Sequence, residues 1–243
     1  MSSTPATPDF SVVIPMKNEE GNVVPLLTEL ADVLESLGSY EIIVVDDGST
    51  DGTWAALQEQ KRRLPTLRLV KFDRNYGQSA ALWAGFKRVR GRIVITMDGD
   101  MQSDPCDIAR MSVELEKGAD VCLTYRVERQ DSWARKFQSL VGNGMRNRLL
   151  RSDIRDTGSQ LRAFHARCLE NLPHFIGMHR FIGNLFLMCG RRVVQIPTRH
   201  RRRHAGAAKY GMGNRMWRGL KDLLAVRWMA QRTIRYKVEH EDD

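Results

Sequence analysis

A regular alternation of short apolar runs with longer amphipathic segments constrains the fold of this chain more than any other feature. Runs rich in Val, Ile and Leu predict five strands, at 10–15, 40–45, 67–72, 93–97 and 120–124. Apolar residues at helical spacing predict a helix after each of the first four, at 22–37, 53–63, 79–89 and 107–117. Strands that alternate with helices of this length are typical of an α/β fold, in which a mostly parallel sheet has helices on both faces.

Two predicted strands run directly into acidic residues. Asp46 and Asp47 follow one of them, and Asp98, Asp100 and Gln102 follow another. Alternate residues of an extended chain share a face, so the last three side chains can point the same way. The carboxyl ends of parallel strands meet at one edge of the sheet, so one crevice can hold both groups. Carboxylate and carboxamide oxygens suit Mg²⁺ or Mn²⁺ that carries phosphates.

The second half of the chain has a different character. Basic or apolar helical spacing predicts helices at 132–150, 162–172, 180–188 and 215–236, with a short strand at 193–197 and a basic loop at 199–213. We therefore expect three parts: a flexible tail at 1–9, an α/β catalytic domain at 10–213, and a basic amphipathic helix with an acidic tail at 214–243.

Composition excludes several classes of protein. The four cysteines are scattered without a Cys-x-x-Cys pair, which disfavours a disulfide framework or a zinc site and indicates a reducing compartment. The sequence contains no run of 18 apolar residues, so no membrane-spanning helix is predicted. The glycine motifs of dinucleotide-binding and P-loop proteins are also missing. The formal net charge of +9, concentrated in the second half, favours a polyanionic partner.

Seven short motifs, in this order and spacing, carry a resemblance to a known family. They lie at 12–20, 44–53, 74–78, 97–102, 129–136, 156–162 and 203–211. With them the chain resembles family 2 glycosyltransferases of GT-A fold, specifically the polyprenyl-phosphate sugar transferases. The resemblance implies an inverting, metal-dependent transfer of a sugar from a UDP- or GDP-sugar to a polyprenyl phosphate, in cell-envelope biosynthesis.

The resemblance also implies roles for individual residues. Base and ribose of the nucleotide would be held by Pro15, Glu19 and Asp47, with Asp98 near the nucleotide sugar. Asp100 and Gln102 resemble the pair that binds Mg²⁺ or Mn²⁺. Arginines that hold the lipid phosphate are matched by Arg126 and Arg135, and the basic loop over the diphosphate is matched by Arg203 and Lys209.

The residues by themselves leave simpler interpretations open. Asp46 fits a bracing role in its loop, and Asp156 fits a turn cap as well as a site residue. Arg126 and Arg135 could be solvated surface charges. The six histidines lack metal-ligand spacing, and packing or surface roles suit them. The predicted helix at 215–236 has a face that bears Trp217, Leu220, Leu224 and Trp228. This face could pack against the rest of the protein or lie in a membrane surface, and the sequence favours the two about equally.

The expected partners follow from these assignments. They are a nucleotide-sugar donor, a polyprenyl-phosphate acceptor and an anionic membrane that the chain meets peripherally from the cytoplasmic side. No nucleic acid is expected, since no nucleic-acid-binding module is recognisable, and a homo-oligomer is left open. Two alternatives stand beside this interpretation. One is a family 2 enzyme acting on a soluble or lipopolysaccharide-type glycan, and the other is a non-catalytic membrane- or nucleic-acid-binding protein.

Overall fold

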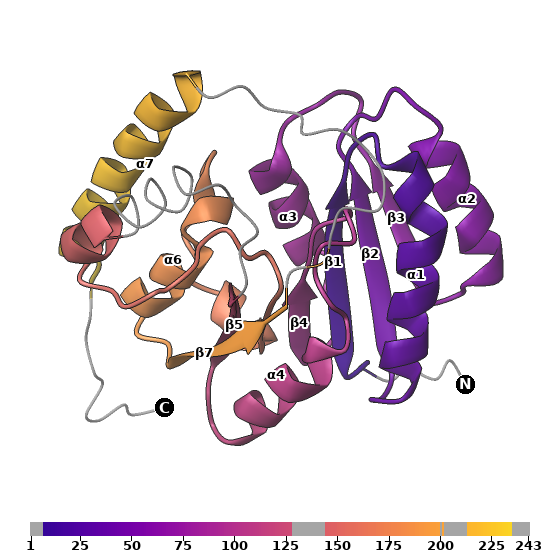
Figure 1. Cartoon of the computed structure of the whole chain (residues 1–243), viewed down its shortest axis with the longest axis horizontal. Helices are drawn as coiled ribbons and strands as arrows, with labels where there is room; N and C mark the ends of the chain where they lie inside the picture. Colours follow the sequence, from indigo (N-terminus) through magenta and orange to yellow (C-terminus); the bar gives the residue numbers. More distant parts are fainter. Residues whose placement is uncertain (1–6, 128–143, 200, 202–212, 235–243) are drawn as a thin grey trace, which may run out of the picture.

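The computed structural model describes residues 7–127, 144–199, 201 and 213–234, and these form a sheet of seven strands with helices on both faces (Figure 1). The strands are β1 (Phe10–Met16), β2 (Tyr40–Asp46), β3 (Leu67–Lys71), β4 (Ile93–Thr96), β5 (Val121–Arg126), β6 (Arg162–His165) and β7 (Val193–Thr198). Their order in the sheet is β3-β2-β1-β4-β6-β5-β7. All neighbours pair in parallel except β6, which is antiparallel to both β4 and β5. The predicted mostly parallel α/β architecture is confirmed.

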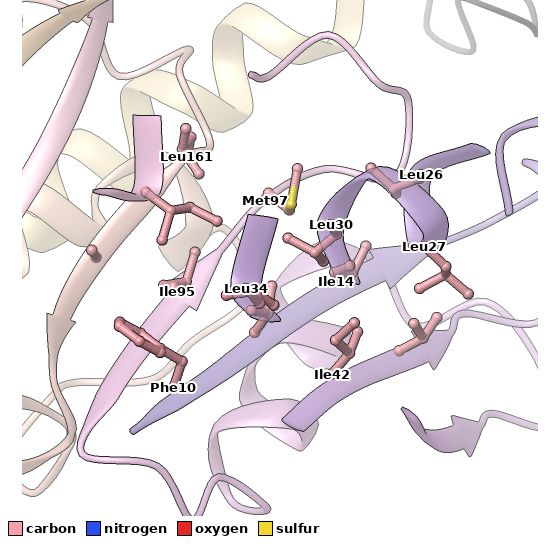
Figure 2. Close-up of a cluster of buried hydrophobic side chains, with 14 of the residues drawn as sticks. Phe10, Ile14, Leu26, Leu27, Leu30, Leu34, Ile42, Ile95, Met97 and Leu161 are labelled. Carbon is pink, nitrogen blue, oxygen red and sulfur yellow. The ribbon is translucent and has the colours of Figure 1, made fainter. Parts of the chain in front are cut away.

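Alternating side chains on the strands build two apolar layers. The described helices are α1 (Glu20–Glu35), α2 (Thr53–Arg63), α3 (Gln78–Phe86), α4 (Asp107–Glu116), α6 (Ile182–Met188) and α7 (Gly213–Arg232), together with a helical stretch at 144–150. On β1, Ile14 lies in the layer formed with α1, α2 and α4, near Leu30 and Leu34 (Figure 2). Val13 points the other way, into the layer formed with α3, α6 and α7. A strand buried on both faces explains the unbroken apolar run of this segment.

The predicted helix at 162–172 is wrong. Residues Arg162–His165 form β6, and only Ala166–Leu169 make a short 3-10 turn. The segment lies between β4 and β5, and Ala163 pairs with Ile95 on one side and with Cys122 on the other. Backbone hydrogen bonds to the two adjacent strands therefore outweigh the local helical spacing of apolar residues. The helix predicted at 180–188 is shorter than expected, because Met178–Arg180 form a separate 3-10 turn before α6.

Helix α7 is buried along a different face from the one that its large apolar residues suggest. Leu223 and Val226 are buried against the α6 side of the sheet, with 4% and 1% of their surface exposed. Leu224 and Trp228, two of the four residues expected on one apolar face, are 54% and 61% exposed. Ordinary packing therefore does not bury these two side chains. Among the residues that the structure describes, no helix is both long and apolar enough to cross a bilayer.

Candidate functional site

The turn after β4 brings the predicted acidic residues to one pocket. Asp98, Asp100 and Gln102 all line a hollow of about 50 Å³ at the carboxyl edge of the sheet. The backbone N–H of Gln102 donates to Asp100 Oδ1 at 3.1 Å, and Met101 between them has a left-handed backbone with φ of 59°. A Cβ on Gly99 would come within 2.8 Å of Met16 Cγ, so glycine allows the turn to pack against β1. The three side chains are therefore held together by a tight, specific turn.

Asp98 is fixed by a residue to which sequence analysis gave no role. Gln78, at the start of α3, donates its Nε2 to Asp98 Oδ1 at 2.7 Å. Arg162 interacts electrostatically with Asp98, is 4% exposed, and donates from its guanidinium to the carbonyl of His179 at 3.0 Å. Burial lowers the pKa of Arg162 to about 10, and the charge of Asp98 opposes that shift. The signal for Gln78 was present in the 74–78 motif, but its pairing with Asp98 is a tertiary contact.

The acidic pair after β2 braces its surroundings. Asp46 accepts bonds from the backbone N–H and the hydroxyl of Ser49, as expected for a bracing role. Asp47 accepts the backbone N–H groups of Tyr76 at 2.7 Å and Gly77 at 2.9 Å. Burial raises the pKa of Asp47 above its ordinary value, although these two bonds act in the opposite direction. The carboxylate of Asp47 therefore holds the 74–77 loop beside the carboxyl end of β2.

The other residues expected at the nucleotide lie at the same edge of the sheet. Pro15 pairs with Val45 near the end of β1. The backbone N–H of Glu19 donates to Thr53 Oγ1 at 2.8 Å, and its carboxylate accepts from Asn22 at 2.6 Å. Pro15, Glu19 and Asp47 do not line the pocket that contains Asp98. The structure thus places Pro15 near the end of β1, and Glu19 and Asp47 in the turns after β1 and β2, rather than in the pocket itself.

Arg126 lies in the pocket wall and is bound to Asp156. Its Nε donates to Asp156 Oδ2 at 2.7 Å and its Nη2 to Asp156 Oδ1 at 3.0 Å, so the pair is bidentate. Burial, the largest single effect, would raise the pKa of Asp156, but the hydrogen bonds and charge of Arg126 together with the N–H of Gly158 outweigh it and hold that pKa below its usual value. The expectation that Asp156 caps a turn is also met, since Asp156 Oδ1 accepts the N–H of Gly158 at 2.8 Å.

Other predicted site residues fall outside the described part of the chain. They are Arg135, Arg203 and Lys209. Arg201, which the structure does describe, forms ion pairs with Glu29 at 2.6 Å and with Asp104 at 2.8 Å. The N–H of Arg201 also donates to the carbonyl of Gln102 at 3.0 Å. Near the start of the predicted basic loop, Arg201 is therefore tied to the Asp98–Gln102 turn.

The oxygen donors of the pocket fit a divalent cation. Asp100 is 9% exposed and lies beside Gln102, and carboxylate and amide oxygens are the donors that Mg²⁺ and Mn²⁺ prefer. Within the described residues, no group of three or more His, Cys, Asp or Glu is placed to hold a metal. An ion here would therefore take further oxygens from a phosphorylated ligand or water, as is usual for Mg²⁺ with nucleotides.

A larger hollow lies away from these carboxylates. It measures about 600 Å³ and is lined by the 149–152 stretch, α6 and α7, without an acidic residue. The smaller pocket contains the paired carboxylates, the carboxamide and an oriented arginine, so we assign the site there despite its size.

The strand order, with an acidic turn at the carboxyl edge, is that of a GT-A type nucleotide-sugar transferase fold. The chain belongs to glycosyl transferase family 2, whose model matches residues 11–173. It is 38% identical over 205 residues to undecaprenyl-phosphate 4-deoxy-4-formamido-L-arabinose transferase of Edwardsiella ictaluri (strain 93-146), a match that covers 83% of this chain. That match covers 63% of the relative, so this chain spans less than two thirds of its length.

Solved structures support the same fold. Glucosyl-3-phosphoglycerate synthase from Mycobacterium tuberculosis with Mg²⁺ and UDP superposes with a TM-score of 0.68 at 18% identity, covering 92% of this chain and 79% of the other. The same enzyme with Mn²⁺, UDP and glucosyl-3-phosphoglycerate gives 0.67 at 19% identity, covering 92% and 80%. At these identities the likeness establishes the fold, and the chemistry has to be argued from the residues of this chain.

Proposed function

We propose that this chain is the catalytic part of an inverting, metal-dependent glycosyltransferase that moves a sugar from a UDP- or GDP-sugar to a polyprenyl phosphate. The observation that carries the proposal is one pocket in which Asp98, Asp100 and Gln102 lie together with Arg126. The relative named above acts, by its name, on undecaprenyl phosphate. The neighbouring structures with UDP and Mn²⁺ or Mg²⁺ are consistent with the donor and the metal.

The pocket residues divide the chemistry between donor and acceptor. Asp100 and Gln102 would hold the cation, which when bound supplies positive charge against the leaving diphosphate. Asp98, kept in place by Gln78, would accept hydrogen bonds from the donor near its sugar. We assign Pro15, Glu19 and Asp47 to the base and ribose, and Arg203 and Lys209 to the diphosphate. One displacement at the anomeric carbon would invert its configuration.

The acceptor class follows from the side chains around the pocket. A lipid phosphate is already anionic near neutral pH and needs an oriented cation more than a general base. Arg126 is such a cation, and none of the described residues that line the pocket is a histidine. A guanidinium matches a phosphate through parallel N–H donors. We assign Arg126, with Arg135, to the acceptor phosphate.

A lipid acceptor requires contact with a membrane, and α7 offers a suitable surface. Leu224 and Trp228 lie one turn apart and are both largely exposed, and Lys221, Arg227 and Arg232 belong to the same helix. Tryptophan and leucine beside basic residues are typical of helices that lie in an anionic membrane surface. We propose that the chain meets the cytoplasmic face of the membrane through this side of α7.

A donor screen tests the function. Nucleotide release from UDP- and GDP-sugars is measured with and without Mn²⁺ and a polyprenyl phosphate, on the unmodified chain and on Asp100→Ala. We expect release that depends on both additions and is abolished in the variant. Asp32→Ala, which removes a carboxylate from the exposed side of α1, should leave release unchanged. Full activity of Asp100→Ala or in EDTA would refute the metal assignment, and equal transfer to an acceptor without phosphate would favour a glycan acceptor.

A further inference from the structure

We propose that Asp156 is a positioning residue that fixes the Arg126 guanidinium in the pocket wall for the phosphate of the acceptor. The inference deepens the proposed function, since it rests on the assignment of Arg126 to that phosphate. Asp156 itself would touch neither substrate nor metal, and it does not line the pocket.

The geometry fixes both the place and the plane of the guanidinium. Two parallel N–H···O bonds, at 2.7 and 3.0 Å, join Arg126 to both oxygens of Asp156. The same carboxylate also accepts the backbone N–H of Arg126 at 3.3 Å, so it binds both the backbone and the side chain of Arg126. The Arg126 and Asp156 side chains are 17% and 9% exposed, which shields the pair from solvent. A bidentate pair of this kind has little rotational freedom.

Gly158 leaves the space that the guanidinium occupies. A Cβ at this position would overlap Arg126 Nη2 and would lie 3.2 Å from its Cζ. Any side chain at 158 would therefore push Arg126 away from Asp156 or from the pocket. Gly158 also lines the pocket, next to Arg126. Asp156, which binds the guanidinium, and Gly158, which leaves room for it, are thus only two residues apart in the same turn.

Two further arginines lie within electrostatic reach of Asp156. Arg146 and Arg162 are 7% and 4% exposed, and the charge of Asp156 favours the protonated form of both. Arg146 is held by Thr157 at 2.7 Å and by the carbonyl of Ile154 at 2.9 Å, so it cannot take the place of Arg126 in the pocket wall. Asp156 therefore interacts with three guanidinium groups, and Asp98 also acts on Arg162.

Positioning matters because the acceptor must approach the sugar along a defined line. A guanidinium that already has its bound orientation loses less conformational freedom when the phosphate arrives. Removing the charge of Asp156 would leave Arg126 positive but free to adopt other rotamers. We therefore expect weaker acceptor binding with unchanged donor binding.

The test is a double-mutant cycle that compares Asp156→Asn, Arg126→Ala and the double variant. The acceptor is a short-chain isoprenyl phosphate, and KM is measured for acceptor and donor separately. We expect Asp156→Asn to raise the acceptor KM about tenfold, the scale of one charged hydrogen bond, with donor KM unchanged. The double variant should be no worse than Arg126→Ala, because Asp156 would act through Arg126.

Two further variants separate positioning from folding. Gly158→Ala keeps every charge but displaces the guanidinium, so it should also raise the acceptor KM. Asp153→Asn removes an exposed carboxylate three residues upstream and should change neither KM. Melting temperatures are compared for all variants. If Arg126→Ala raises the acceptor KM but Asp156→Asn does not, or if their effects add, the positioning role is overturned. If Arg126→Ala has no effect on that KM, the assignment of Arg126 to the acceptor falls first, and the positioning role with it.

Discussion

At the scale of single residues, the site depends on pairs that are distant in sequence. Gln78 and Asp98 are twenty residues apart, and Arg126 and Asp156 thirty. In each pair we assign one member to the substrate and propose that the other sets its orientation. The acidic residues themselves were identified from the sequence, because they follow strands directly. Gln78 was given no role and Asp156 was left open between a turn cap and a site residue, since nothing local distinguishes a glutamine at a helix start or an aspartate in a turn from a simple cap.

The Gln78–Asp98 contact gives a pH-dependent prediction. In Gln78→Glu a second carboxylate faces Asp98, so donation is lost and two like charges meet. We expect kcat/KM to fall at neutral pH and to recover in part as the pH drops, because one protonated acid restores a donor. The profile is measured from about pH 4.5 to 8. Gln58→Glu, on the exposed side of α2, is the matched control. A profile parallel to that of the unmodified chain would contradict the contact.

The Asp156–Arg126 pair makes a prediction about acid stability. The pKa of Asp156 is lowered in the folded chain, because the hydrogen bonds and charge of Arg126 and the N–H of Gly158 together outweigh the effect of burial. The pair's contribution is therefore complete above the unfolded pKa, near 3.9, and is lost as the pH falls through the folded value. We expect Asp156→Asn to be less stable than the unmodified chain at pH 7, by about 1–3 kcal/mol, with a difference that shrinks below about pH 4. Urea midpoints of both proteins across this range measure it, and a constant difference would count against the ionised pair.

At the scale of elements, the strands and helices predicted correctly from the sequence are those with a long, continuous pattern of apolar residues. The four parallel strands β1 to β4 and the helices between them lie where apolar periodicity placed them, within a few residues at their ends. β6 was missed because it is four residues long and is specified by its two neighbours rather than by its own residues. In α7 the apolar residues surround much of the helix, so periodicity alone could not show which side is buried.

The exposed side of α7 leads to a prediction about membranes. Leu224→Ser and Trp228→Ser together should weaken sedimentation with anionic vesicles at low salt, because apolar insertion and charge act jointly. Binding should fall as salt rises and should be poor on neutral vesicles. Val24→Ser with Val113→Ser removes two apolar side chains of comparable exposure (48% and 45%) from α1 and α4. If that control pair weakens binding as much as the α7 pair, the contact lies elsewhere.

At the scale of the whole molecule, the donor and the metal should act as one ligand. Asp100 and Gln102 provide too few oxygens to complete a coordination sphere, and a diphosphate would supply the rest. A ligand at about 100 times its Kd stabilises the folded state by roughly 2.7 kcal/mol. We expect UDP or GDP with Mn²⁺ to raise the melting temperature more than the sum of the separate shifts.

The same measurement also identifies the base. Only the nucleotide that matches the donor should give the full rise in melting temperature together with Mn²⁺. Asp100→Ala should remove this joint rise but keep any rise caused by the nucleotide alone. Equal shifts with and without the metal would show that the cation does not bridge protein and diphosphate.

The reversed strand β6 has a consequence for how the chain becomes active. β4 and β5 have no direct ladder, and β6 joins them. Its antiparallel direction puts its first residue at the carboxyl edge of its neighbours, so the preceding residues, Gly158 to Gln160, arrive in the pocket. Thr96 and Thr124 then hold the carbonyls of Gln160 and Leu161 at 2.9 Å. Contacts that close such long loops form slowly. We therefore expect the consecutive parallel units to form first and the pocket around Arg126 to be completed late in folding.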